Sequence, residues 1–240
     1  MQLYSFYAFL IGLCFGSFAN VLAYRLPRKE SIVKPPSYCP ACKRSISIID
    51  LIPLVSWLVL RGRCRYCGVH ISVRYPAVEL FCALLFAGIA WRFPFPYVIP
   101  LALFVFVLLS VSLIDWDTQE IPDGLLAFGV LLAVVWIVLG FAWYEALLGA
   151  LVGAMPLLIL NFAVMLIFKK NGFGFGDVKL MAVAGLFLGW YYILMAYFFA
   201  FVLGGVYAGF LLVSGRGRRG DYIAFAPFLA FGVFFGLCHL

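Results

Sequence analysis

Long stretches without a charged residue are the feature that most constrains this chain. At about 1.5 Å of rise per residue, a helix of some 20 residues crosses the ~30 Å hydrocarbon layer of a bilayer. Only 11% of the 240 residues are charged, whereas soluble domains carry roughly 25%, so a soluble globular protein is excluded. The runs are continuously apolar rather than alternating, which predicts helices and not a barrel. The runs that contain no Asp, Glu, Lys or Arg are 1–24, 93–114, 124–144, 146–168 and 222–240.

The basic residues predict the orientation of these helices. Ten of the 17 Lys and Arg lie between Arg25 and Arg74, and short loops rich in Lys and Arg stay in the cytoplasm. No basic residue precedes the first run and no small-residue cleavage site closes it, so we expect a retained span rather than a signal peptide. The basic segment also predicts affinity for anionic lipid. Its basic residues are interleaved with Cys and Pro rather than lying along one helix face, which argues against a nucleic-acid partner.

A sixth uncharged run covers residues 180–215, which is too long for a single crossing. Basic residues flank it on both sides, so an even number of crossings must separate them, and we expect two short helices that turn near Gly189. The sequence therefore predicts an all-α polytopic membrane protein of about eight transmembrane helices, with both termini outside. We expect three parts: a first helix at 1–24, a cytoplasmic loop domain at 25–75 and a seven-helix core at 76–240. The basic residues that flank the long run are Lys169, Lys170, Lys179, Arg216, Arg218 and Arg219.

Four of the seven cysteines form two Cys-x-x-Cys pairs in the basic segment. The pairs are Cys39 with Cys42 and Cys64 with Cys67, separated by 21 residues, a spacing at the upper edge of that of four-thiolate zinc sites. Four such sulfurs complete a tetrahedron around the ion at ~2.3 Å, and a reducing cytosol disfavours disulfides. We expect structural Zn²⁺ here rather than catalytic zinc, because four thiolates leave no position for water. A redox pair or a metal-free loop is the alternative.

Two of the ten acidic residues have an unusual position. Asp115 ends an apolar run and Asp177 opens another after a glycine-rich segment, so both are predicted at the cytoplasmic rim of the membrane. Ionisable groups at membrane depth indicate function, and two adjacent carboxylates can share a proton, one activating water while the other donates. Helix capping by Asp177 and transport of a proton or cation are the alternatives. Asp123 is a reserve candidate, and Glu79 is either a first-turn acid, a partner of an Arg or part of a polar site.

With these residues in place, the chain resembles the bacterial type IV prepilin peptidases, which are membrane aspartyl proteases with a Gly-x-Gly-Asp motif. The matching elements span almost the whole chain. Only the last one departs modestly, because Ile223–Ala226 lacks the usual Pro and Gly, but no acid or base is lost. The matching elements are Gly16–Val21 with Arg25 and Pro27, the paired cysteines, Leu51–Pro53, Ser56-Trp57, Arg61–Cys64, Tyr75-Pro76 with Glu79, Ile114-Asp115, Ile121–Asp123, Gly174–Lys179 and Ala226–Phe228.

The resemblance implies an enzyme of the bacterial inner membrane with Asp115 and Asp177 as catalytic residues. It implies cleavage of the basic leader of prepilins or pseudopilins after a Gly, and N-methylation of the new terminus with S-adenosylmethionine. A zinc-stabilised carrier or a non-catalytic pilus-assembly scaffold is the alternative. We further expect Asp177 to be the initial base, because it opens a helix whereas Asp115 lies near a helix C-terminus. Four small residues are expected to pack against the substrate's helix: Gly149, Gly153, Gly204 and Gly205.

Overall fold

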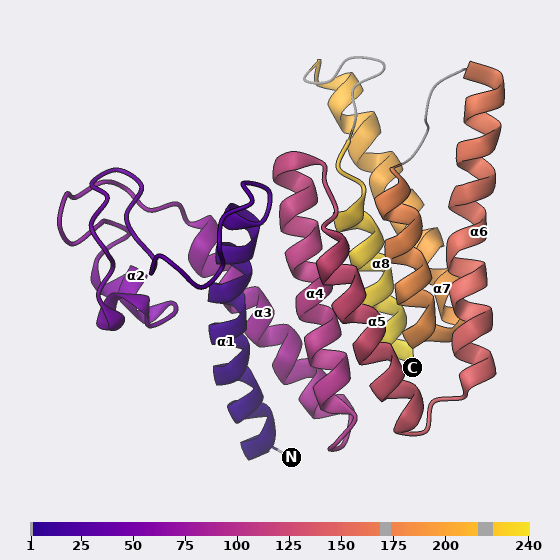
Figure 1. The fold of residues 1–240 in the computed structure, drawn as a ribbon, viewed down its shortest axis with the longest axis horizontal. Helices are drawn as coiled ribbons and strands as arrows, with labels where there is room; N and C mark the ends of the chain where they lie inside the picture. The colour runs from indigo at the N-terminus through magenta and orange to yellow at the C-terminus, as the bar shows by residue number, and fades with distance from the viewer. Residues whose placement is uncertain (1, 169–173, 216–222) are drawn as a thin grey trace. The chain divides into compact units, whose positions relative to one another are not determined.

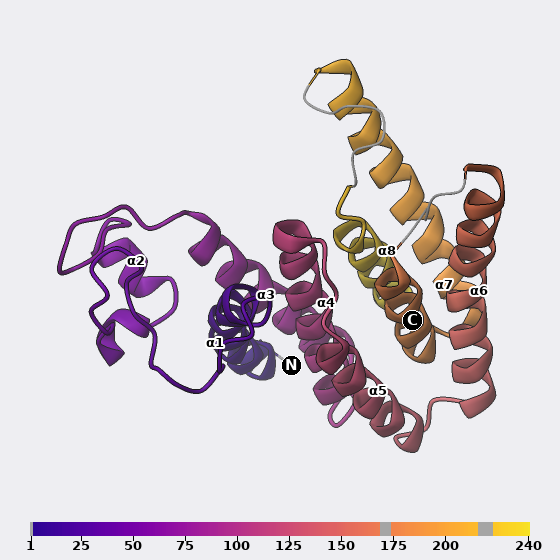
Figure 2. The same ribbon diagram turned by 45° about the horizontal axis from the view of Figure 1, so that its top comes forward.

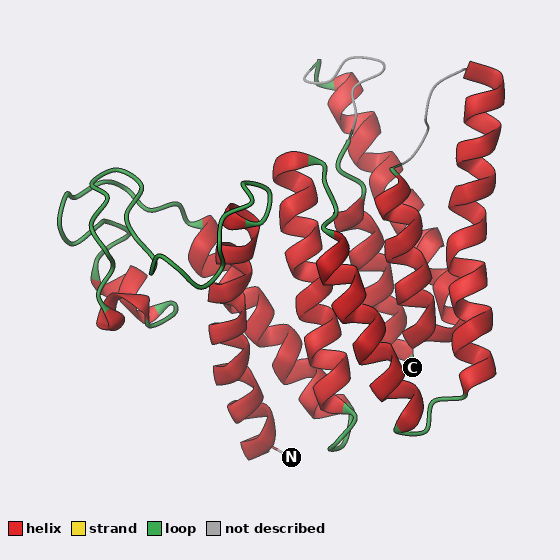
Figure 3. Cartoon of the chain, in the orientation of Figure 1, coloured by secondary structure: helices red, strands yellow, loops and turns green. Residues whose placement is uncertain are grey.

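The computed structural model describes residues 2–168, 174–215 and 223–240, which form helices joined by loops (Figure 3). The chain divides into two compact units, Met1–Val98 and Ile99–Leu240, and each is considered by itself. The elements, labelled in Figure 1, are α1 (Gln2–Arg25), η1 (Ile48–Leu51), α2 (Val55–Val59), α3 (Arg74–Arg92), α4 (Val98–Thr118), α5 (Asp123–Val138), α6 (Trp143–Phe168), α7 (Phe175–Val213) and α8 (Ala226–His239).

The first unit is a pair of helices, α1 and α3, with the loop between them. The helices touch at their backbones because α1 presents glycines to α3. A Cβ built on Gly12 would lie 2.7 Å from the Ala83 Cα, and one on Gly16 would lie 2.6 Å from the Glu79 Cα. Such distances leave no room for a side chain, so these glycines set the spacing of the two helices. The loop between them carries both cysteine pairs and the short helices η1 and α2.

The second unit is built around α7, which packs against α6 on one side and α8 on the other, as both views show (Figure 1 and Figure 2). A Cβ on Gly149 or Gly153 of α6 would collide with backbone atoms of α7, and one on Gly204 would lie 2.7 Å from the Phe225 ring. Three of the four glycines expected to receive a substrate helix are thus used for packing within the protein, and that expectation is wrong for them. Gly205 alone of the four faces open space.

The long uncharged run folds as predicted. Gly189 interrupts α7 with φ 72° and ψ 178°, a left-handed conformation that glycine adopts without strain. The helix turns back there, and Figure 1 shows both ends of α7 at the same end of the unit. Counting the two halves of α7 separately, the described residues contain eight apolar helices beyond the short η1 and α2, which confirms the predicted number. The flanking basic residues Lys169, Lys170, Arg216, Arg218 and Arg219 lie outside the described residues.

Five helices are long and apolar enough to cross a membrane by length and composition, among the residues that the structure describes. They are α1, α3, α4, α6 and the two-part α7, while α5 and α8 are shorter apolar helices. The all-helical, multi-pass membrane architecture expected from the uncharged runs is therefore confirmed.

Candidate active site

Asp115 lies three residues before the end of α4 and is buried, with 6% of its surface exposed. Its Oδ2 accepts a hydrogen bond of 3.0 Å from the backbone N–H of Ala226, and the Phe225 N–H acts on the same carboxyl group. Ala226 is the first residue of α8 and Phe225 is its N-cap. The first N–H groups of a helix have no partner within that helix, so Asp115 satisfies the open N-terminus of α8.

Asp177 is the third residue of α7 and is also buried, with 8% exposed. Its carboxylate interacts with the backbone N–H of Gly174, the N-cap residue. An acid at this position that reaches back to the N-cap N–H is half of a capping box, so the capping role considered from the sequence is present. The contact with Gly174 leaves part of the Asp177 carboxylate without a hydrogen bond. The Asp177 Oδ1 is buried and has no hydrogen-bond partner within the described part of the chain.

The two aspartates lie within electrostatic reach of each other. The charge of Asp115 acts on Asp177, although 62 positions separate them in the sequence. The charge of Asp177 in turn reaches Tyr197 of the second half of α7, whose hydroxyl donates to the Gly153 carbonyl of α6. The site therefore takes groups from α4, from the start of α8 and from both halves of α7.

Helix dipoles do not assign the initial base, contrary to the expectation from the sequence. That expectation requires Asp115 to lie away from any helix N-terminus, and Asp115 does lie near the C-terminus of its own helix, α4. However, the N-terminus of α8 points at its carboxylate through Ala226. Both carboxylates therefore lie at the positively polarised N-terminus of a helix, and the macrodipole does not distinguish between them. The sequence carries no side-chain signal for this contact, because the donor is a backbone group.

Gly176 explains how α7 brings Asp177 to this position. A Cβ on Gly176 would lie 2.8 Å from the Cβ of Ile121, so only glycine lets the start of α7 approach the turn before α5. Beyond that turn, Lys179 of α7 makes a 2.8 Å ion pair with Asp123, the first residue of α5. The Asp123 side chain is 74% exposed. The structure therefore does not bring this reserve candidate into the buried pair, and it also leaves Asp117 and Glu120 exposed.

Glu79 is buried within the first unit, with 8% exposed. It accepts a 2.8 Å hydrogen bond from the Leu54 N–H and a second from the Ser17 hydroxyl. Leu54 has φ 60°, an unfavourable conformation for a branched residue, and the carboxylate holds its N–H. Glu79 thus joins α3 to α1 and to the loop. It is an internal polar group rather than a first-turn acid.

The two cysteine pairs have the same local structure. In each, the N–H of the first Cys donates to the carbonyl five residues later, which is Arg44 in one pair and Val69 in the other. An antiparallel bridge flanks each pair, at Tyr38–Ser45 and Arg63–His70. The residue after the second Cys takes a left-handed conformation in both, Lys43 with φ 59° and Gly68 with φ 71°. These are two equivalent turns, each of which points two sulfurs to the same side.

The four sulfurs lie within 4.8 Å of one another, and Cys39 and Cys67 are 3.8 Å apart. Four sulfurs at ~2.3 Å from a tetrahedral zinc ion would lie about 3.8 Å apart, so the cluster fits that metal. The N–H groups of Cys67 and Tyr66 lower the pKa of the Cys64 thiol to about 7, whereas desolvation and the neighbouring thiols raise the pKa of Cys67 to about 11, so the thiols of the cluster titrate together. The loop is further tied together by hydrogen bonds of 2.6–3.1 Å from Arg65 to Asp50, which hold the Asp50 pKa below its usual range.

Comparisons with known proteins find matches for the segment with the cysteine cluster and for the segment with the two buried aspartates. Residues 10–93 match the bacterial peptidase A24 N-terminal domain, and residues 102–209 match the type IV leader peptidase family. The first match contains the cysteine cluster, and the second contains both buried aspartates. No solved structure shows significant similarity to the chain.

Relatives named "Prepilin leader peptidase/N-methyltransferase" match over most of the chain. The protein from Bacillus subtilis is 36% identical over 227 residues, covering 93% of this chain and 90% of its own. The Myxococcus xanthus protein is 39% identical, covering 91% and 66% respectively, and that of Stutzerimonas stutzeri is 35% identical, covering 93% and 86%. Because relatives at 35–39% identity match over most of its length, and the two family models match in succession along it, the chain belongs to the type IV leader peptidase family.

Proposed function

We propose that this protein is a prepilin peptidase that removes the basic leader of type IV prepilins or pseudopilins after a Gly, and that it also N-methylates the exposed terminus. The observation that carries the peptidase proposal is the buried pair of Asp115 and Asp177. Two segments separated by 62 positions each bury a carboxyl group, and the charge of Asp115 acts on Asp177, which supports a shared site. A structural role would not require the second acid, whereas acid–base hydrolysis requires both.

One carboxylate of the pair is the proposed base, which takes a proton from water, and the Asp177 Oδ1, without a partner among the described residues, is open to that water. The water oxygen then forms a bond to the carbonyl carbon of the scissile peptide. The other carboxyl group donates a proton that is passed to the leaving amine as the C–N bond breaks. The pair is proposed to share one proton through the cycle, as coupled carboxylates do.

The cysteine cluster is proposed to hold structural Zn²⁺ through Cys39, Cys42, Cys64 and Cys67. The ion would order the loop between α1 and α3, which has only the short helices η1 and α2 of its own. Methylation is proposed from the names of the relatives, with S-adenosylmethionine as methyl donor. We assign no residue to that cofactor.

The proposed location is the bacterial inner membrane, with both termini outside and the cysteine loop in the cytoplasm. The excess of Lys and Arg between Arg25 and Arg74 supports this orientation. Both aspartates then lie at the cytoplasmic side, where a prepilin changes from a basic leader to an apolar helix. Gly at the cleavage position lowers the helix propensity of the substrate there, which eases the unwinding that hydrolysis needs.

The direct test compares Asp115→Asn, Asp177→Asn and the matched control Asp123→Asn. The first two should abolish cleavage of a prepilin in detergent, while protein level and metal content persist. The control removes an exposed carboxylate from the same region and should leave cleavage within a few-fold of wild type. Mass spectrometry of a prepilin incubated with enzyme and S-adenosylmethionine reads cleavage and methylation together. Normal cleavage by either buried-site variant would refute the peptidase mechanism.

A carrier that moves a proton or cation is the rival of another class. It needs a polar route across the membrane, but the helices contain few ionisable residues apart from those near their ends. The same variants separate the two functions, because a carrier would leave a prepilin intact even as wild type.

A further inference from the structure

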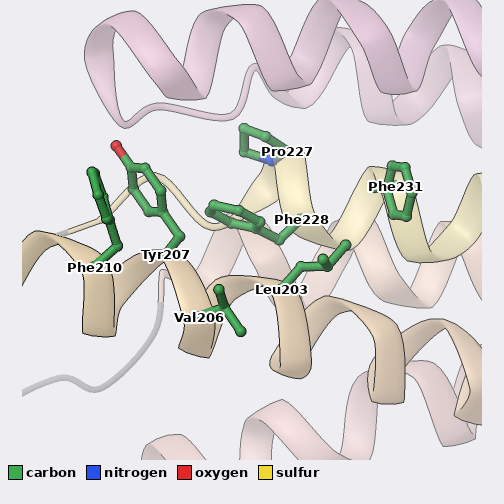
Figure 4. A pocket seen from close by; sticks show the side chains of 7 residues that line it. All are labelled: Leu203, Val206, Tyr207, Phe210, Pro227, Phe228 and Phe231. Atoms are coloured by element: carbon green, nitrogen blue, oxygen red, sulfur yellow. The ribbon is translucent and has the colours of Figure 1, made fainter.

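An open apolar groove of about 500 Å³ lies between the second half of α7 and the start of α8 (Figure 4). Its size is that of a binding site for a few side chains. The lining contains a single polar group, the hydroxyl of Tyr207. The residues that line it are Leu203, Val206, Tyr207, Phe210, Pro227, Phe228 and Phe231.

The groove lies beside segments that carry the proposed active site. Pro227 follows Ala226, whose N–H holds Asp115. On the other wall, the ring of Tyr207 contacts Trp116 at 5.8 Å between centroids, and Trp116 follows Asp115 in α4. The same Tyr207 ring lies 5.4 Å from that of Phe228. Two independent contacts therefore connect the groove with the residues next to Asp115.

From that point the groove leads away along α8. Pro227 lies in the first turn of this helix and Phe231 lies about one turn further, and the opposite wall runs from Phe210 to Leu203, about 10 Å along α7. Figure 4 shows Pro227 and Phe228 near Tyr207, and Phe231 farther along α8. A chain bound with its scissile peptide at Asp115 would thus continue into an apolar channel.

We propose that this groove binds the apolar side chains that directly follow the scissile bond of the substrate, so that it determines which residues are accepted there. The inference rests on the proposed peptidase function. A basic leader does not suit a surface with one hydroxyl and no charge, whereas aromatic and aliphatic side chains gain from burial against these rings. The groove therefore selects the membrane-embedded side of the substrate and not its leader.

The test is a substrate-selectivity measurement on the full chain in detergent. Two prepilins are compared that differ only in the residue after the scissile bond, Phe in one and Ala in the other. Leu203→Trp fills the groove and should lower the kcat/KM ratio of the Phe substrate to the Ala substrate about tenfold, since pocket discrimination of this kind reaches 10–200-fold. Val202→Trp, one position away and 46% exposed, is the matched control and should leave the ratio unchanged.

A crosslinking experiment reads the binding place independently of any change in the groove. A prepilin with a photoreactive Phe analogue after the scissile bond is irradiated with the Asp177→Asn protein, which should retain the uncut substrate. Adducts on α7 between Leu203 and Phe210, or in the first two turns of α8, are expected. Adducts elsewhere, or with lipid alone, would overturn the proposal, as would an equal ratio for Leu203→Trp and Val202→Trp. Failure of the wild-type protein to cut either prepilin would instead refute the peptidase function.

Discussion

Gly176→Ala should reduce peptidase activity by displacing Asp177. The added Cβ would lie 2.8 Å from the Ile121 Cβ and 3.1 Å from two further atoms of that side chain, against 3.4 Å for an ordinary contact. The shortfall is 3.4 − 2.8 = 0.6 Å, and Asp177 is the next residue. Overpacking costs about 1–3 kcal/mol, and a misplacement of ~1 Å in an active site can cost ~100-fold. We therefore expect kcat/KM for prepilin cleavage to fall by roughly 10- to 100-fold.

Gly174→Ala is the matched control. Its Cβ would meet the Asp177 Oδ2 at 3.4 Å, its φ of −67° suits alanine, and the N–H that acts on Asp177 is kept. Activity should stay within a few-fold of wild type. Combining Gly176→Ala with Ile121→Gly removes the colliding side chain and should recover most of the loss. Wild-type activity in Gly176→Ala, or equal losses in the two alanine variants, would show that the clash does not position Asp177.

Three further outcomes follow from packing, hydrogen bonding and metal binding. Gly185→Ala should lower the free energy of unfolding by about 2 kcal/mol or more, because its Cβ would overlap the α6 backbone. Gly205→Ala faces open space and should raise the free energy of unfolding by about 0.5–1 kcal/mol. Thermal unfolding in detergent measures both. Asp115→Ala leaves the buried Ala226 N–H without its acceptor and should cost about 1–3 kcal/mol, whereas Asp115→Asn keeps an acceptor oxygen and should be close to wild type by the same assay. Zinc should be lost as the pH is lowered, because protons compete with the metal for the four thiolates, and metal analysis after equilibration across a pH series, with limited proteolysis of the loop, checks this.

Most of the fold follows from where charge is absent. The uncharged runs predict the apolar helices because unpaired ionised groups cannot be buried in hydrocarbon. Basic residues on both sides of the run 180–215 require an even number of crossings between them, which predicts a turn within the run. The structure has this turn at Gly189. The cysteine cluster was predictable for a different reason, because each Cys-x-x-Cys is a local turn whose geometry depends on few distant contacts. What these features share is that the signal lies in side-chain type.

The parts that the sequence did not predict depend on backbone groups and on tertiary distance. The N–H of Ala226 has no sequence signature, so the sequence does not predict the donor to Asp115, although Ala226–Phe228 is one of the elements that carry the family resemblance. The glycines of α6 are sites of close packing, as the sequence predicts, but their partner is a helix of the same chain and not the substrate. A small residue shows that something approaches closely, and only the fold shows whether it is a substrate or, as for Gly149, the neighbouring helix α7.

The asymmetry between the two aspartates lies in hydrogen bonding rather than in helix dipoles. Both carboxyl groups lie at a helix N-terminus, α8 for Asp115 and α7 for Asp177. Asp115 is held from outside its own helix by the backbone of α8, so its orientation depends on the packing of α4 against that helix. Asp177 is held locally by Gly174, and its Oδ1 is left without a partner in the described structure. Backbone N–H donors stabilise the ionised form of a carboxyl group, so the contacts from α8 favour Asp115 as the charged member of the pair. The buried Asp177 Oδ1, which has no such donor, is better suited to carry the shared proton. The sequence could not supply this difference, because the donors are backbone groups.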